Sequence, residues 1–203
     1  MSGKQDTSQE TASVPDDVVE VVERCLAGDQ AAMADVVRQY QGQVFGLCYR
    51  MLGDRQDAED MAQETFVRVI RSLDRWDSAR AFEPWLLAIA GNRCRTLLAT
   101  RKRRPDTSPI VADVPAREYD AEAQAHRTLA EEVSLGLADI RDEYRQAFLM
   151  FHQHEMSYGD IAASMKCPLG TVKTWIHRAR RELIDHLRSR GIVEETSHAV
   201  RSV

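Results

Sequence analysis

The sequence predicts an all-α protein made of two helical modules joined by a flexible linker. Apolar residues recur at intervals of three and four along most of the chain, which is the period of an amphipathic helix. Aromatic residues make up only 6% of the sequence, which favours helices over sheets. The periodicity stops where Pro105, Pro109 and Pro115 fall among polar residues, and the linker is placed there. The predicted division is a disordered tail (1–15), a first module (16–104), the linker (105–126), a second module (127–190) and a C-terminal tail (191–203).

Composition limits the functions that the chain can have. With 203 residues it can bury one sizeable core or two small ones, and its net charge is −5. Any contact with nucleic acid must therefore come from local basic patches. The four cysteines form no C-x-x-C pair, so they predict buried thiols of a reducing compartment and no disulfide or zinc site. Because no apolar run approaches the roughly 20 residues of a membrane span, and the N-terminus lacks an apolar signal core, we expect a cytoplasmic protein without membrane insertion.

Four helices are expected in the first module. The first follows Pro15, the second spans about 30–52, and the third spans about 57–73. A polar loop at 74–81 leads to the fourth, which has Pro84 in its first turn, where a missing N–H costs nothing.

The third helix begins with an acidic face formed by Asp57, Glu59, Asp60, Gln63 and Glu64. Acids in a first turn are stabilised by the positive end of the helix dipole, which explains the first three but not Glu64. A contiguous acidic face is also what a basic partner helix would dock on. The residues alone leave both interpretations open.

The fourth helix ends in a basic run without a compensating acid. Its members are Arg93, Arg95, Arg101, Lys102, Arg103 and Arg104. Cations suit a helix C-terminus, but this run exceeds what the dipole requires. It therefore indicates a second possible nucleic-acid patch.

The clearest motif is a helix-turn-helix at Met156–Leu183. Ser157 can cap its first helix, and Pro168 marks the turn. The second helix leaves a polar, basic strip exposed, formed by Lys173, Thr174, His177, Arg178 and Arg181. Such a strip fits the major groove, where Arg and Lys reach guanine edges and phosphates, although a solvated surface helix is the alternative.

Three segments together resemble bacterial extracytoplasmic-function (group 4) sigma factors of the sigma-70 family. LGDRQDAEDMAQETFVRVIRSL (52–73) is close to the family's L-G-D-x-x-D-A-E-D-x-x-Q-E-x-F pattern. FEPWLLAIAGNRC (82–94) matches F-x-x-W-L-x-x-I-A-x-N, and GTVKTWIHRARREL (170–183) matches G-T-V-K-S-x-x-H-R-A-R-x-x-L. Their order and spacing identify the chain as a member of this family.

The resemblance implies a non-enzymatic protein that binds core RNA polymerase and promoter DNA and is controlled by an anti-sigma factor. It implies no cofactor, catalytic residue or metal site. The positions corresponding to the polymerase-docking acids are Asp57, Asp60, Gln63 and Glu64. Asn92 matches the asparagine that holds a flipped base of the minus-ten element, and the weaker candidates beside it are Arg80, Arg93, Arg101 and Lys102. The minus-35 element would be read by Lys173, Thr174, His177, Arg178 and Arg181.

The chain departs from the family pattern at several positions. Thr96 and Ala99 stand where relatives often have Asp and Arg, which bears on the minus-ten assignments. Lys166 replaces the usual glycine of the helix-turn-helix turn, where a positive φ would cost about 1 kcal/mol, so we expect a slightly different turn. Trp175 replaces a frequent arginine and is expected to pack inward.

Parts of the sequence are also compatible with two other functions. A stand-alone helix-turn-helix regulator would need neither the acidic helix nor the second basic patch. A carboxylate-metal phosphoesterase would use Asp57, Glu59, Asp60 and Glu64, but the sequence offers no second ligand set and no glycine-rich phosphate loop.

Overall fold

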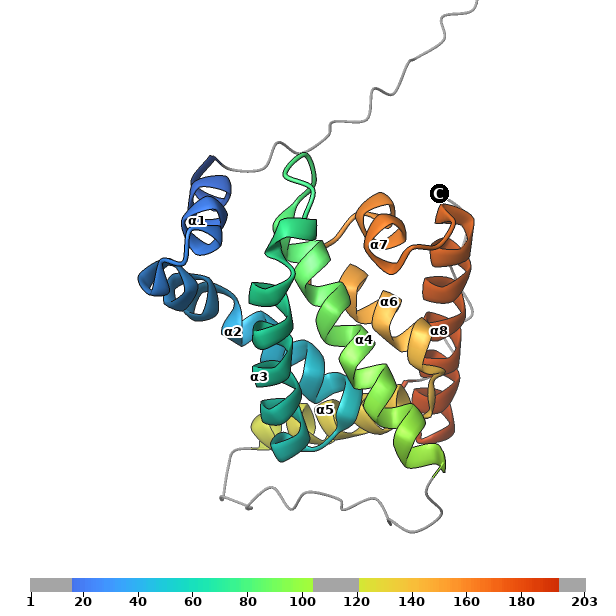
Figure 1. The fold of residues 1–203 in the computed structure, drawn as a ribbon. Coiled ribbons are helices and arrows are strands. Elements are labelled where there is room, and N and C mark those ends of the chain that lie inside the picture. Colours follow the sequence, from blue (N-terminus) through green and yellow to red (C-terminus); the bar gives the residue numbers. More distant parts are fainter. Residues whose placement is uncertain (1–15, 104–120, 194–203) are drawn as a thin grey trace, which may run out of the picture.

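The computed structural model describes residues 16–103 and 121–193, and every regular element within them is a helix. The first module contains α1 (Asp16–Leu26), α2 (Gln30–Leu52), α3 (Arg55–Arg71), the short 3-10 helix η1 (Leu73–Arg75) and α4 (Phe82–Arg103). The second contains α5 (Ala121–Asp139), α6 (Asp142–His152), α7 (Tyr158–Met165) and α8 (Leu169–Ser189) (Figure 1). The all-α prediction is confirmed. The predicted tail at 1–15 and most of the predicted linker and C-terminal tail lie outside the described residues.

Three predicted boundaries differ from the structure. The third helix begins at Arg55 instead of about 57, because Asp54 caps it by accepting a hydrogen bond from the Asp57 N–H at 2.8 Å, and it ends at Arg71 instead of about 73. Residues 121–126, which the sequence places in the linker, belong to α5.

The first module is organised around α2, which contacts α1, α3 and α4. Gly53 ends α2 in the left-handed conformation (φ 73°), and its N–H bonds the Tyr49 carbonyl at 2.8 Å. This cap lets Asp54 start α3 at once, so α2 and α3 form a hairpin. Leu47, Val69 and Leu86 are fully buried between the helices, and each buried aliphatic side chain of this size contributes about 2 kcal/mol.

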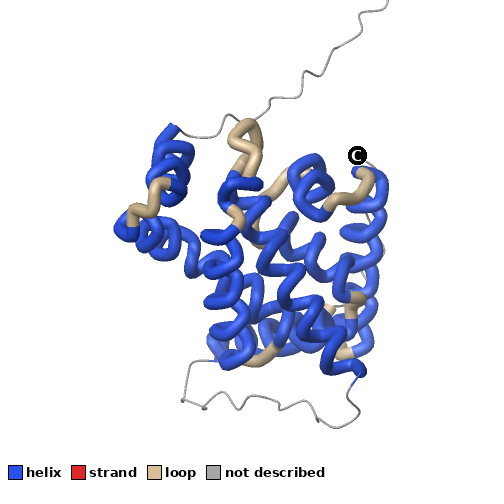
Figure 2. The backbone as a smooth tube through the Cα atoms, in the orientation of Figure 1, coloured by secondary structure: helices blue, strands red, loops and turns tan. Residues whose placement is uncertain are grey.

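The second module places the helix-turn-helix, α7 and α8, against α6. Ser157 caps α7 through a hydrogen bond from the Asp160 N–H at 3.1 Å, as the sequence predicts. Ile161 and Ile176 are buried across the motif. Arg190 donates two hydrogen bonds to Glu132, at 2.8 and 2.9 Å, and so ties the end of α8 to α5. Figure 2 shows that short loops join the helices within each module.

The two modules pack against each other, a placement that the sequence left open. In Figure 1, α6 lies between α4 and α8. Contacts join α4 to α6 and α7, and α2 to α5 and α6. We call these contacts the inter-module interface. The buried apolar residues of both modules form one continuous cluster, so the described chain is compact.

Candidate nucleic-acid interface

The exposed strip of α8 has the geometry of a recognition helix. Its buried face is formed by Val172, Ile176, Ala179 and Leu183, which pack into the core. All five predicted minus-35 residues are exposed on the other side, namely Lys173, Thr174, His177, Arg178 and Arg181. A face with donors and positive charge on a fixed helix can enter a major groove.

Three of these side chains already have partners within the chain. Arg178 donates to the Tyr144 hydroxyl at 2.9 Å, and its guanidinium lies 5.8 Å from the centre of that ring. Thr174 donates to the Gly170 carbonyl at 2.9 Å. Lys173 lies 5.8 Å from the Tyr158 ring. Within the described residues, Lys173, His177 and Arg181 have no carboxylate partner.

The turn before α8 contains a left-handed residue, although that residue is Lys166 and not glycine. Lys166 takes φ 54° and ψ 47°, and its N–H bonds carbonyls of α7. The expectation of a different turn is wrong, because the C-cap hydrogen bonds of α7 hold Lys166 in the left-handed conformation at a cost of about 1 kcal/mol. Trp175 packs inward against Tyr144, with ring centres 6.1 Å apart, as predicted.

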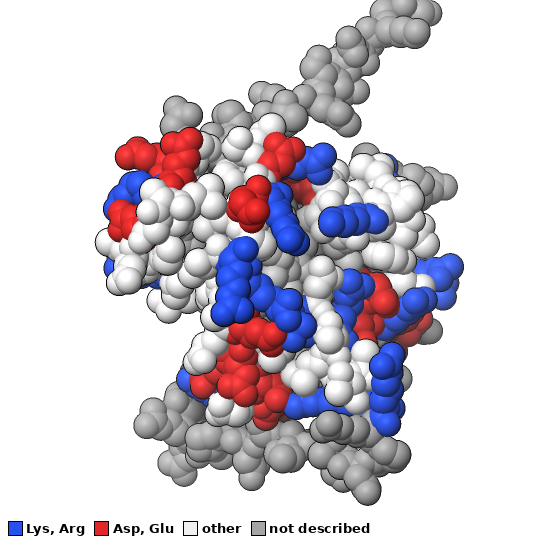
Figure 3. All heavy atoms as spheres, in the orientation of Figure 1, with Lys and Arg blue, Asp and Glu red and all other residues white. Residues whose placement is uncertain are grey.

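The acidic face of α3 is divided between solvent and α4. Asp57 pairs with Arg101 at 2.5 Å, and Glu64 pairs with Arg93 at 2.7 Å. Glu64 also accepts from Arg68 at 3.2 Å. Figure 3 shows acidic side chains gathered over the first half of α3, directly beside basic ones.

Asp60 and Gln63 are the exposed members of this face. Asp60 accepts a 3.3 Å hydrogen bond from Gln56, one turn away on the same helix. Neither side chain has an ion-pair partner among the described residues. They are the part of the predicted docking set that another protein can reach most directly.

Four of the five predicted minus-ten residues lie on α4, and the fifth, Arg80, lies before it. Asn92 is exposed near the middle, and Arg93, Arg101 and Lys102 follow it. Arg80 lies before the helix and pairs with Asp77 at 3.2 Å. Since α4 has 22 residues and rises about 1.5 Å per residue, Arg80 is separated from Lys102 by roughly 30 Å and does not join them.

Comparisons with known proteins show which family this chain resembles. Residues 36–104 match the protein family described as sigma-70 region 2, and residues 136–183 match sigma-70, region 4. The chain is 35% identical over 182 residues to the ECF RNA polymerase sigma factor SigW of Bacillus subtilis, covering 82% of this chain and 95% of SigW. It is 34% identical over 184 residues to the RNA polymerase sigma-H factor of Pseudomonas aeruginosa, covering 82% of this chain and 91% of that protein.

The chain belongs to the extracytoplasmic-function sigma-70 family. It is therefore a promoter-specificity factor of RNA polymerase and not an enzyme, and the two alternative functions are set aside. CnrH in complex with the cytosolic domain of CnrY has the same fold, with a TM-score of 0.62 and 24% identity over 84% of this chain and 96% of CnrH. The first module corresponds to region 2 and the second to region 4.

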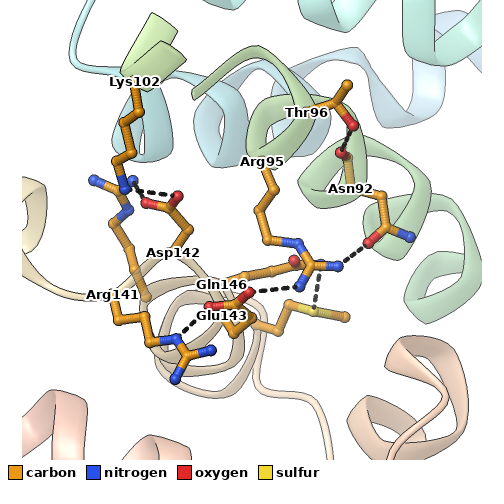
Figure 4. Close-up of polar contacts among 10 residues, drawn as sticks. Asn92, Arg95, Thr96, Lys102, Arg141, Asp142, Glu143 and Gln146 are labelled. Carbon is orange, nitrogen blue, oxygen red and sulfur yellow. Dashed lines mark hydrogen bonds and ion pairs between the residues drawn. The ribbon is translucent and has the colours of Figure 1, made fainter. Parts of the chain in front are cut away.

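Sequence reasoning missed the partners that region 4 supplies to α4. Arg95 donates to the Asn92 side-chain oxygen and also lies 3.7 Å from Glu143 of α6 (Figure 4). Lys102 pairs with Asp142 of α6 at 3.1 Å. Both acids stand in the first turn of α6, where the helix dipole explains them, and nothing in the sequence marked them as interface residues.

The pKa values of two glutamates reflect these contacts. The hydrogen bond from Arg93 lowers the pKa of Glu64, burial opposes it, and Arg68 lowers it further. For Glu143, burial works against ionisation, but a backbone N–H, Arg141 and Arg95 together lower its pKa. Both carboxylates are thus held ionised beside α4.

The structure gives no support to a metal site on α3. Asp57 and Glu64 each face an arginine of α4 rather than each other. Across 16–103 and 121–193, no three His, Cys, Asp or Glu side chains are grouped so that they could hold a metal ion. In the same part of the chain, no helix is long and apolar enough to cross a membrane.

Proposed function

We propose that this sigma factor uses three separate surfaces in initiation. The acidic face of α3 docks on core RNA polymerase, Asn92 with the cations of α4 binds the minus-ten element, and α8 reads the minus-35 element. The observation that carries the proposal is the exposed, basic strip of α8 opposite its buried face, because that arrangement presents donors to a groove on a rigid support.

Docking through α3 is supported by the exposure of Asp60 and Gln63 at the centre of the acidic face. Asp57 and Glu64 flank them and are held by Arg101 and Arg93, so they contribute less directly. A basic helix of the polymerase would pair with Asp60 without first breaking an ion pair. Charge at such a surface steers association and sets specificity.

Asn92 is proposed to hold an unstacked base of the minus-ten strand. Arg95 occupies its side-chain oxygen, which leaves the amide donors directed away from that bond. Arg93, Arg101 and Lys102 would contact phosphates and help to offset the cost of a few kcal/mol for extruding a base. Arg80 is proposed to contact the strand separately, from the loop before α4.

Control by an anti-sigma factor is also proposed. The structures with the same fold include CnrH with the cytosolic domain of CnrY, and the sigma factor RpoE of Bartonella quintana with the anti-sigma factor NepR at a TM-score of 0.62 and 21% identity over 76% of this chain and 96% of RpoE. A partner of the same kind would cover the surfaces described above. Because promoter recognition takes place at the bacterial chromosome, we place this protein in the cytoplasm.

The test measures binding of the full chain to purified core polymerase. Asp60→Lys reverses the exposed charge of α3, and we expect binding to weaken about tenfold, since a close charge pair becomes a repulsion. Asp74→Lys is the matched control, because it makes the same charge change at an exposed residue of η1, beyond the C-terminal end of α3 and several turns from Asp60.

Two results would count against the proposal. If the wild type does not bind core polymerase, the chain does not act as a sigma factor with that enzyme. If Asp60→Lys and Asp74→Lys bind as tightly as the wild type, the docking surface lies elsewhere.

A further inference from the structure

A cavity of about 440 Å³ lies between regions 2 and 4, outside the three surfaces proposed above. Its walls come from α2, from the first turn of α4 and from the loop that follows α6. Sites for small molecules occupy cavities of roughly 300–1,000 Å³ and are often found between domains. This cavity is therefore large enough for a small ligand that touches both regions. The residues that line it are Gly42, Gln43, Glu83, Gln153, His154 and Glu155.

Three side chains of this wall bury a polar atom that has no hydrogen-bond partner among the described residues. The atoms are Oε1 of Gln43, Oε1 of Gln153 and Nε2 of His154. The His154 side chain is only 4% exposed, so solvent does not compensate its ring nitrogen. Buried polar atoms are normally paired, because leaving one unpaired lowers stability. Two of these three atoms are amide oxygens, which can only accept, so the wall offers acceptors to a ligand that carries N–H donors.

Glu83 gives the cavity a negative charge that no cation of the described chain balances. Its one ion-pair candidate there is His154, with 3.7 Å between Oε1 and Nδ1. Burial and the nearby charge of Arg50 lower the pKa of His154, so this ring is neutral near pH 7. Burial raises the pKa of Glu83 against a hydrogen bond from Gln43, so its ionised form is not fully compensated. Glu155 adds a second carboxylate at the exposed edge of the cavity.

Gln153 brings region 4 into contact with the region 2 side of the cavity. Its side chain lies over α2, where a Cβ added at Gly46 would stand 3.0 Å from Nε2. The last torsion of a glutamine side chain has a broad energy profile, so its amide turns easily. Turning Oε1 of Gln153 into the cavity breaks no hydrogen bond of that oxygen. A ligand in the cavity can therefore gain this acceptor at little cost.

We propose that this cavity binds a small aliphatic cation, an amine or a guanidine. One ammonium or guanidinium group pairs with the Glu83 carboxylate, and its other N–H groups donate to Oε1 of Gln43 and Gln153. The ligand contacts α2 and α4 of region 2 and the α6–α7 loop of region 4 at the same time. Its binding therefore stabilises the arrangement in which these walls stand together. The inference does not depend on how the protein binds DNA or core polymerase.

The test measures binding of putrescine and of agmatine to the full chain by isothermal titration calorimetry. The neutral diol of the same chain length as putrescine is the matched ligand control. We expect both cations to bind, with NMR shift changes concentrated at the lining residues, and the diol to bind at least about tenfold more weakly. At about 100 times its Kd, a cation should raise the Tm by about 5–10 °C, since it binds the folded chain.

Variants from both regions locate the site. Glu83→Gln keeps the shape of the side chain and removes its charge, so we expect putrescine binding to weaken at least about tenfold. Gln153→Met removes the acceptor that region 4 supplies and should weaken binding about fivefold. Glu182→Gln is the matched control, because it makes the same change at an exposed glutamate of α8, which does not line the cavity. It should bind putrescine as the wild type does. Thermal unfolding without ligand checks that each variant is folded.

Four outcomes would overturn the inference. Neither cation could bind at millimolar concentration, or the diol could bind as tightly as putrescine, which would mean that charge plays no part. Glu83→Gln and Glu182→Gln could weaken binding equally, which would indicate diffuse attraction to the net charge of −5. Binding could also be weakened by Glu83→Gln but unchanged in Gln153→Met, and the ligand would then not bridge the two regions.

Discussion

The two basic surfaces of this sigma factor differ in how far the chain itself neutralises them. On α4, Arg93 and Arg101 pair with acids of α3, and Lys102 and Arg95 with acids of α6. On α8, the exposed cations of the predicted recognition strip, Lys173, Arg178 and Arg181, have no carboxylate partner among the described residues. If these cations bind DNA as proposed, region 4 can do so in the packed arrangement, whereas region 2 must exchange acid partners for phosphates.

This difference has an energetic meaning. An exposed ion pair is worth between 0 and about 1 kcal/mol, so each pair on α4 would be a small barrier to the proposed DNA binding. Several pairs on one helix add to a barrier that a single-stranded DNA must overcome. Binding of DNA by α8 would meet no such barrier. We therefore expect region 4 to supply most of the binding free energy when the packed chain binds duplex DNA.

The largest expected effect is a difference between the α4 and α8 surfaces in the salt dependence of DNA binding. Each phosphate contact contributes about 0.9 to the slope of log K against log salt on duplex DNA. We expect Lys173→Ala/Arg181→Ala to reduce the slope of the free chain by up to about 1.8 and to weaken binding on the order of tenfold at low salt. Fluorescence anisotropy with a mixed-sequence duplex measures both quantities.

Arg93→Ala/Arg101→Ala is the comparison variant for this measurement. Because both arginines are engaged by α3 acids, their loss should change the slope much less. Equal reductions in the two variants would show that the cations of α4 are as available as those of α8, and the contrast between the surfaces would fail.

A smaller effect is expected at the buried amide of α6. Gln146 is fully buried, its Oε1 has no partner, and its Nε2 reaches only the Met150 sulfur at 3.9 Å. Gln146→Met removes the unpaired groups at similar length, so we expect the free energy of unfolding to rise by about 1 kcal/mol. Urea denaturation measures this, with the exposed Gln41→Met as a control that should stay within about 0.5 kcal/mol of the wild type.

Gln146→Met also tests the difference between the α4 and α8 surfaces. A more stable interface keeps α4 covered, so single-stranded DNA binding should weaken, while duplex binding through α8 should be unchanged. An unfolding free energy below that of the wild type would mean that the amide is better satisfied than the buried oxygen indicates.

The helices could be predicted because their signals are local. Gly53 and Asp54 end one helix and start the next, and the periodicity of α3 and α8 identifies their buried faces. The inter-module interface could not be predicted, since the residues that mark it beside the shared apolar core are polar. Asp142 and Glu143 look like ordinary acids of a first turn, and the burial of Gln146 depends on a glycine 55 positions earlier.

The ion pairs between α3 and α4 could not be predicted from the sequence either. Sequence patterns treat Asp57 and Glu64 as docking acids and Arg93 and Arg101 as DNA contacts. The structure shows that these residues pair with one another across the two helices. Such pairing depends on how α3 and α4 pack, which no local pattern contains.

A further effect, of about 1 kcal/mol on the free energy of unfolding, is expected at the helix-turn-helix turn of region 4. Lys166 is held at φ 54°, so Lys166→Gly should relieve the left-handed strain and raise the free energy of unfolding by up to about 1 kcal/mol. Lys166→Ala keeps the strain and should give no gain. Thermal unfolding should shift by about 2–4 °C for each kcal/mol in a protein of this size. A gain with alanine equal to that with glycine would point to the lysine side chain and not to its backbone.

The smallest expected effect concerns the pairing of α3 with α4. The hydrogen bond from Arg93 lowers the pKa of Glu64, so the folded protein holds this carboxylate ionised more firmly than the unfolded chain does. A lowered folded pKa stabilises the fold above the ordinary glutamate pKa of about 4.3, and this contribution is lost as the pH falls through the folded value. Because the Glu64 side chain is 34% exposed, screening limits the contribution to below about 1 kcal/mol. The difference in unfolding free energy between wild type and Glu64→Gln should therefore be present at pH 7 and vanish in acid.

Titration of Glu64 by NMR gives the more direct measurement. In Arg93→Ala its midpoint should move up toward the ordinary value, because the largest cause of its lowered pKa is gone while Arg68 remains. In Lys173→Ala, a change on α8, it should stay where it is. A midpoint that does not move in Arg93→Ala would show that the pairing across α3 and α4 is not formed in solution, and the cations of α4 would then be as free as those of α8.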